Sequence, residues 1–167
     1  HLQALLAGDI PALAESRSAK PFTQDGVTIL GGHGVFVEDG VVVEPHVVFD
    51  TSIGPVFLSH GASVQAFTRI VGPCYVGEHS SILGGRVAGC SIGEVCRVHG
   101  EVSCTTFVGH SNTGHDGFVG HSVLGRWVNL GAGTTTSNLK NTYGTVSLWT
   151  PEGTADTKLQ FLGTLFG

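Results

Sequence analysis

Aliphatic side chains recur at steps of six residues along most of this sequence, and no other feature constrains the fold as strongly. The steps read Val35, Val41, Val47, Ile53, then Val64, Ile70, Val76, Ile82, then Ile92, Val98, Cys104, and finally Asn112, Phe118, Leu124, Leu130, Thr136. A period of six fits neither an α-helix nor a hairpin. It is the hexapeptide signature of a β-helix, in which each hexapeptide forms one flat side of a coil.

Small residues precede these steps by two positions. They are Thr51, Ala62, Thr68, Cys74, Ser80, Cys90, Cys96, Ser122 and Thr134. Because side chains alternate across a strand, we expect each step residue and its small partner to point inward together. Gly follows many of the steps and permits a sharp corner there. The sequence therefore predicts an all-β fold, a parallel β-helix. An antiparallel sandwich or barrel is the alternative, but NG and DG turns do not recur at hairpin spacing.

Both ends of the chain depart from the repeat. Residues 1–17 space leucines and Ile10 roughly as a helix does, which predicts a short connecting helix with Pro11 at a break or start. Residues 142–167 lose the six-residue step, and the TPEG turn at 150–153 predicts an excursion before an unfinished final coil. The chain starts with His1 and has no Met, so we expect a stretch of a longer protein.

The charge pattern excludes several classes of partner. Charged residues make up 13% of the chain, the net charge is −5, and the few Lys and Arg are scattered, so neither nucleic acid nor a membrane surface is an expected partner. No apolar run is long enough to span a bilayer, and the start HLQALLAGDI does not resemble a signal peptide. We expect a cytoplasmic protein.

The four cysteines have spacings that do not suggest a metal site. There is no CxxC pair, and three of the four occupy the small inward position, so we expect reduced thiols that fill the core. The histidines are more informative, because His110, His115 and His121 cluster where the step residue is the polar Asn112. Either chemistry or an irregular coil with a surface loop explains this break in the pattern.

His115 is the strongest catalytic candidate in that cluster. It lies three residues before Phe118, which places it on the outside near a corner, where an imidazole can act as a general base near neutral pH. His115 and His121 are six residues apart and so fall on consecutive sides of the coil. They do not converge, and we expect no metal site.

Residues 100–141 resemble a known family. GEV at 100–102, SNTGHDGFVGHSVLG, and WVNLGAGTTTSNLKN at 127–141 are similar, without gaps, to the acetyltransferase domain of the bifunctional glucosamine-1-phosphate acetyltransferase/N-acetylglucosamine-1-phosphate uridyltransferase family. The segments SNLKNTYG and HDGF resemble its sugar nucleotidyltransferase branch more closely. This resemblance implies a left-handed β-helix that works as a homotrimer. It also implies that residues 1–30 are a linker and helix after an upstream nucleotidyltransferase domain, and that 31–167 are an acyltransferase domain incomplete at its C-terminal end.

The resemblance also implies site residues. His115 matches the base that takes a proton from the sugar amine, Asn129 and Asn138 match residues lining the acceptor and acetyl-CoA site, and the backbone of Ala132 and Gly133 would lie against the cofactor. Three positions depart from the family pattern: Ser103 replaces a phosphate-binding Lys, and Phe118 and Leu139 replace tyrosines. With that Lys absent, Arg86, Arg97 and Lys140 are the candidates to bind the sugar phosphate.

The implied function is acetyl transfer from acetyl-CoA to the amine of an amino-sugar 1-phosphate, within a sugar-nucleotide-forming enzyme. Mg²⁺ would serve only the upstream nucleotidyltransferase domain. One alternative is a trimerising, regulatory tail without its own acyltransferase activity, which Ser103 and Leu139 favour. A second is a β-helix carbonic anhydrase with zinc held by three His, whose spacing this sequence lacks.

Overall fold

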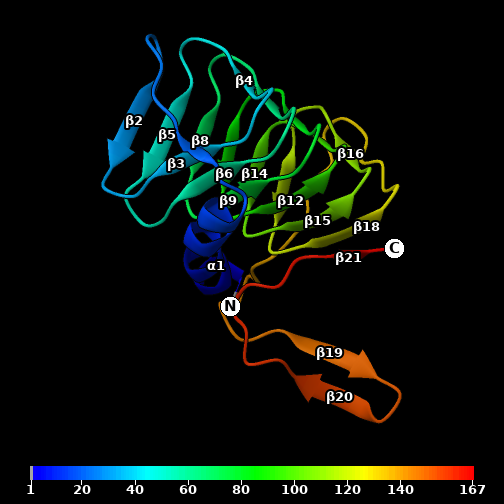
Figure 1. Ribbon diagram of the computed structural model, residues 1–167. Coiled ribbons are helices and arrows are strands. Elements are labelled where there is room, and N and C mark those ends of the chain that lie inside the picture. The colour runs from blue at the N-terminus through cyan, green and yellow to red at the C-terminus, as the bar shows by residue number, and fades with distance from the viewer. Residues whose placement is uncertain (1) are drawn as a thin grey trace.

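Three parallel sheets wind into a three-sided prism in the computed structural model, which describes residues 2–167 (Figure 1). Sheet 1 contains β1 (Lys20–Pro21), β3 (Val35–Val37), β6 (Val56–Leu58), β9 (Cys74–Val76), β12 (Ser91–Glu94), β15 (Thr106–Gly109), β18 (Val123–Arg126) and β21 (Leu165–Phe166). Sheet 2 contains β2 (Thr28–Gly31), β5 (Val48–Thr51), β8 (Arg69–Val71), β11 (Arg86–Ala88), β14 (Glu101–Ser103) and β17 (Phe118–Gly120). Sheet 3 contains β4 (Val42–Val43), β7 (Ser63–Val64), β10 (Ser81–Ile82), β13 (Arg97–Val98) and β16 (Asn112–Thr113).

The chain visits sheets 2, 1 and 3 in turn, and each strand pairs with the strand one coil away. These pairs are parallel, and the short β1 adds to β3 in the antiparallel direction. About six coils stack in this way. The predicted all-β parallel β-helix with a short N-terminal helix is therefore confirmed.

The prism interior is filled by the inward residues of all three sheets. The step residues Ile70, Ile82, Ile92 and Leu124 are completely buried, as predicted, and so is Phe49. The small partners also point inward, because Thr51, Ala62, Thr68, Cys74, Ser80, Cys90, Cys96 and Ser122 are buried. Thr134 is only half-buried.

The prediction that every step residue points inward is wrong at several positions, because the coils differ in length. Val35 pairs with Val56, twenty-one residues later, whereas Ser91 pairs with Thr106, fifteen residues later. The exact six-residue step therefore slips, and Ile53 is 63% exposed. The inward residues near the His cluster are Thr113 and Val119, each one position after the predicted Asn112 and Phe118, and Cys104 occupies a corner.

The glycines after the steps have a different role from the predicted one. The corners are turned in the left-handed conformation largely by other residues, among them His46, Phe67, His79, Val95, Cys104, His110, His121 and Trp127. Gly77 and Gly93 instead let neighbouring coils stack closely. A Cβ on Gly93 would lie 2.4 Å from the carbonyl oxygen of Val108, in the next coil. These glycines are therefore required by backbone contact between coils.

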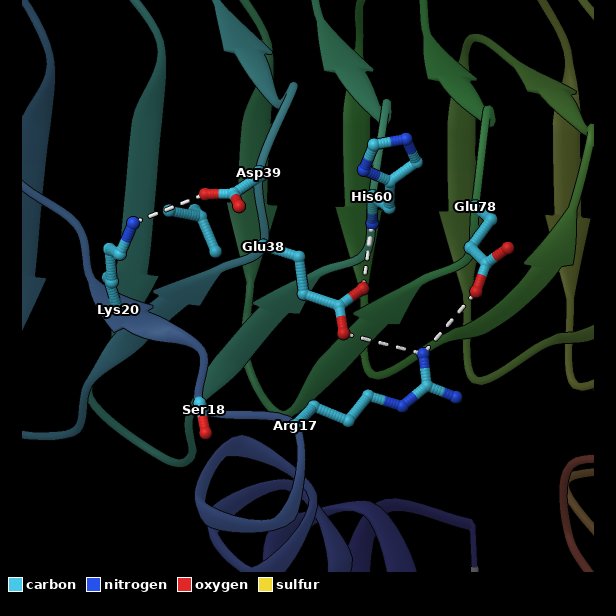
Figure 2. A pocket seen from close by; sticks show the side chains of 8 residues that line it. Arg17, Ser18, Lys20, Glu38, Asp39, His60 and Glu78 are labelled. Carbon is cyan, nitrogen blue, oxygen red and sulfur yellow. Dashed lines mark hydrogen bonds and ion pairs between the residues drawn. The ribbon is translucent and has the colours of Figure 1, made fainter.

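Helix α1 (Leu2–Ser16) packs on the outer face of sheet 1 at β6 and β9 (Figure 1). Its buried side chains, Leu6, Ile10 and Ala14, pack with Phe57. Pro11 lies inside the helix, so the predicted break or start there is wrong. Arg17 follows the helix and pairs with both Glu38 and Glu78 at 3.5 Å, as Figure 2 shows, which links the helix to two coils. Among residues 2–167, no helix is long and apolar enough to cross a membrane.

The C-terminal excursion predicted from the lost repeat is present. Strands β19 (Ser147–Thr150) and β20 (Gly153–Asp156) form an antiparallel hairpin that projects from the prism (Figure 1). Strand β21 then returns to pair in parallel with β18. The hairpin is exposed, and Trp149 is among its side chains open to solvent.

Candidate functional site

His115 lies in the turn between β16 and β17, where sheet 3 meets sheet 2, and we call this corner of the prism the His115 edge. Its side chain is exposed, in agreement with the expected outward position. The turn is held from both sides. The backbone N–H of Gly114 donates to Asn112 Oδ1 at 3.0 Å, and that of Gly133, one coil further on, donates to the Asp116 carbonyl at 2.8 Å.

His99 and Asp116 form a second contact at this turn that the sequence did not suggest. His99 Nδ1 lies 3.2 Å from Asp116 Oδ1 but lacks the alignment of a hydrogen bond, and the nitrogen is sealed from solvent. Asp116 is 94% exposed, so its carboxylate can rotate to accept a hydrogen bond from His99 at this distance. His99 lies one coil before His115. A search for residues one coil apart, rather than six residues apart, would have found it.

Three polar residues form an outward column on sheet 3 beside His115. Arg97 is in register with Asn112, and Asn112 with Asn129. Asn112 Nδ2 donates to Asn129 Oδ1 at 2.7 Å, so the two amides orient each other. Asn112 is polar because its side chain faces outward. It is not a core position at which a functional residue has replaced an apolar one. The structure thus brings predicted Arg97 and Asn129 onto one face next to His115.

Arg86 belongs to a different face. It lies on sheet 2, in register with Glu101, and Glu101 is in register with Phe118. Neighbouring strands are about 4.8 Å apart. The carboxylate of Glu101 therefore stands between Arg86 and the coil that carries His115, which makes the surroundings of Arg86 less favourable for a phosphate.

The GAGT segment forms an exposed ledge directly after Asn129. The N–H of Gly133 donates to the Asp116 carbonyl, and the N–H of Thr134 donates to the Gly131 carbonyl. Within residues 2–167, the amides of Gly131 and Ala132 make no such bond. Added Cβ atoms at Gly131 or Gly133 would meet nothing within 4 Å. The ledge is therefore open, and two of its backbone N–H groups are left without a backbone acceptor in residues 2–167.

Asn138 and Lys140 lie elsewhere. Asn138 Nδ2 is 2.9 Å from His121 Nδ1, in the corner between β17 and β18 that we call the His121 edge. Lys140 Nζ donates to the Thr145 carbonyl at 3.2 Å, within its own loop. Strand β17, about 10 Å long for three residues, separates the two edges. In a single chain, these two predicted site residues do not share a site with His115.

His121 is half-buried, and its ring stacks on Phe161 with centroids 5.2 Å apart. Burial lowers the pKa of its imidazole, so the folded state favours the neutral ring. The unfolded chain binds a proton at a higher pH than the folded chain does. Stability is therefore expected to fall as the pH drops from about 6.5 through the lowered folded pKa.

We predict that His121→Phe reduces this acid sensitivity, because phenylalanine keeps the ring stack without the titrating group. The measurement is the melting temperature at pH 7.5 and pH 5.5 for both proteins. Between pH 7.5 and pH 5.5, the melting temperature of the wild type should fall further than that of the variant. Equal losses in the two proteins would contradict the prediction.

The cysteines divide into two kinds. Burial raises the pKa of Cys74 to about 12 and raises the pKa values of Cys90 and Cys96, so these three thiols stay protonated in the core. Cys104 is half-buried at a corner. All four are free thiols. Within residues 2–167, no three His, Cys, Asp or Glu side chains come together in a way that could hold a metal ion.

Comparisons with known proteins identify the family. No family model matches the chain. The Bifunctional protein GlmU of Acaryochloris marina is 35% identical over 138 residues, which cover 68% of this chain and 30% of that protein. GlmU of Desulfitobacterium hafniense is 29% identical over 155 residues, and GlmU of Bartonella quintana is 29% identical over 140. The chain belongs to the GlmU family.

The GlmU match confirms the family that residues 100–141 resemble, and it extends well beyond them. It covers 75% of this chain for the Desulfitobacterium protein and 76% for the Bartonella protein. The chain spans about a third of the length of these curated GlmU relatives, at 33% and 30%.

Proposed function

We propose that this β-helix transfers an acetyl group from acetyl-CoA to the amine of an amino-sugar 1-phosphate, as part of a sugar-nucleotide-forming enzyme. The observation that carries the proposal is the exposed His115 beside the outward column of Arg97, Asn112 and Asn129. Membership of a family of bifunctional proteins supports it. No covalent enzyme intermediate is needed, because amine and thioester can react directly once they are held together.

In this mechanism, His115 takes the proton as the amine nitrogen attacks the thioester carbonyl carbon. The new C–N bond forms, the C–S bond breaks, and the CoA thiolate leaves and is protonated. Asn129 and Asn112 hold the sugar through their paired amides. The N–H groups of Gly131 and Ala132 are the donors left for the oxyanion, because those of Gly133 and Thr134 already bond to carbonyls.

A second copy of the chain would complete the site. Asn138 lies at the His121 edge, a full strand away from His115, and Lys140 bonds within its own loop. Side-by-side prisms in a homotrimer can set the His115 edge of one chain against the His121 edge of the next. Asn138 would then reach a neighbouring chain's acetyl group, which an isolated chain does not allow.

Arg97 is the proposed phosphate ligand. It is exposed, forms no ion pair with any residue in 2–167, and shares its column with Asn129. We predict that Arg97→Ala raises the KM for the amino-sugar 1-phosphate roughly tenfold to a hundredfold, the value of a charge-assisted hydrogen bond, with kcat nearly unchanged.

Arg86→Ala is the matched control, because Arg86 is also exposed but stands beside Glu101 on sheet 2. It should leave KM within about twofold of the wild type. Steady-state kinetics with varied sugar phosphate at saturating acetyl-CoA measures both. A large rise in KM for Arg86→Ala, together with no change for Arg97→Ala, would place the phosphate site on sheet 2.

The second candidate is a trimerising, regulatory tail without acyltransferase activity. The observations that favour it are Ser103 and Leu139 at positions where the resemblance calls for a Lys and a Tyr, and the use of Lys140 within its own loop. Calorimetric titration of acetyl-CoA into the complete protein separates the two candidates. Saturable binding supports the enzyme, and no binding with or without amino sugars supports the tail.

A further inference from the structure

A small pocket of about 280 Å³ lies at the His121 edge, on the other side of β17 from His115. Leucine side chains and the Phe161 ring form its walls, and Gln3, Cys104 and His121 are its polar members. Helix α1 contributes one side, and the segment returning from the hairpin contributes the other. Among residues 2–167, none that lines it is Asp, Glu, Lys or Arg, so the pocket suits an uncharged group.

Cys104 is the cysteine that lines this pocket. Cys74, Cys90 and Cys96 are sealed in the core, whereas Cys104 is half-buried. Two donors point at its sulfur: Gln3 Nε2 at 3.3 Å and Ser103 Oγ at 3.8 Å. These contacts hold Sγ in place at the pocket wall and solvate it when it attacks.

His121 lies directly above Cys104 in the next coil. Ser103 and Gly120 are register partners, and the His121 N–H donates to the Ser103 carbonyl at 2.9 Å. The two corner residues are therefore about one coil spacing, ~4.8 Å, apart along the prism. Asn138 occupies Nδ1 of the ring and Phe161 stacks on its face, which leaves Nε2 as the free polar atom.

We infer that Cys104 is a covalent modification site that exchanges with small, uncharged disulfides. The sulfur is accessible, is flanked by donors, and lines an apolar pocket with room for the incoming group. The ligand class is a disulfide whose substituents carry no charge, because a charged group would have to shed its water against leucine and phenylalanine side chains. This inference does not depend on acetyl transfer, but it requires the pocket to stay open beside the neighbouring chain of the proposed homotrimer.

The reaction is a thiol–disulfide exchange. Cys104 loses its proton to water, and the thiolate attacks one sulfur of the disulfide. A new S–S bond joins Cys104 to that sulfur, the original S–S bond breaks, and the departing thiolate takes up a proton. The disulfide is the oxidant, and Cys104 ends in a mixed disulfide. The His121 imidazole, with Nδ1 bonded to Asn138, donates from Nε2 to the negative sulfur during the exchange.

The test is mass spectrometry of the native full chain treated with bis(2-hydroxyethyl) disulfide, followed by peptide mapping. We expect one adduct per chain, at Cys104, and none in Cys104→Ser. Glutathione disulfide, which carries carboxylates, should react at least about tenfold more slowly. His121→Phe should slow the neutral reagent roughly tenfold by removing one donor, whereas His79→Phe, at another left-handed corner, should not.

Each part of the inference can be overturned separately. An unmodified native protein, or an adduct at Cys74, Cys90 or Cys96, would show that Cys104 is not the site. Equal rates for the neutral and charged disulfides would show that the pocket does not select its ligand. An unchanged rate in His121→Phe, with the melting temperature retained, would remove His121 from the site.

Discussion

His115→Ala is expected to lower the turnover number for acetyl transfer by roughly two to four orders of magnitude, the usual contribution of a positioned general base. The exposed position of His115 means that the loss arises from chemistry rather than from folding. The measurement is the release of free CoA thiol with time, at saturating acetyl-CoA and sugar phosphate. Size-exclusion chromatography should give the same oligomer for variant and wild type.

His33→Ala provides the control for this change. His33 is also exposed, but it lies in the first coil, between β2 and β3, far along the prism from His115. Its side chain makes no hydrogen bond with residues 2–167, so acetyl transfer should stay within about twofold of the wild type. If both variants retained full activity, His115 would not be the base. If both lost activity together, the imidazole at 115 would have no special role.

Phe49→Ala is expected to cost about 3–5 kcal/mol in the free energy of unfolding. Phe49 is completely buried in the prism and packs edge-on against Phe22, with ring centroids 5.8 Å apart. Replacing it leaves a cavity that the neighbouring coils cannot close, because their backbones are already in contact. That loss is a large share of the stability of an ordinary domain. Chemical denaturation followed by circular dichroism measures it.

Phe67→Ala is the matched substitution on the outside. Phe67 lies one coil further along and is 80% exposed, stacked on His46. We expect its loss to cost less than about 1 kcal/mol. Similar losses for the two variants would mean that the interior of the prism is not the source of its stability.

The β-helix could be predicted from the sequence because every coil must bury side chains of the same kind. Val47, Ile70 and Ile92 all have to point inward, and the six-residue step records this directly. The number of residues in each coil cannot be read from the sequence as directly. A longer coil leaves Ile53 outside, and the step through Asn112 and Phe118 misses the inward residues by one. One-residue slips are the expected failure when alternation is read without the register of the neighbouring strand.

The candidate site was predictable where it depends on a single turn. His115 is exposed, as its position three residues before Phe118 predicted, although the inward residue there is Val119 and not Phe118. Contacts between coils were not predictable in the same way. Asn138 bonds to His121, seventeen residues earlier, and His99 meets Asp116 across the same kind of step. Pairs about one coil apart in sequence are the signal that finds such contacts in a solenoid.

The central claim is acetyl transfer by the assembled β-helix. It is tested most directly by incubating the complete protein with acetyl-CoA and a panel of amino-sugar 1-phosphates, and by identifying the products by mass spectrometry. We predict one N-acetylated sugar phosphate for every CoA thiol released. An intact oligomer that acetylates no member of the panel and releases no CoA would contradict the account.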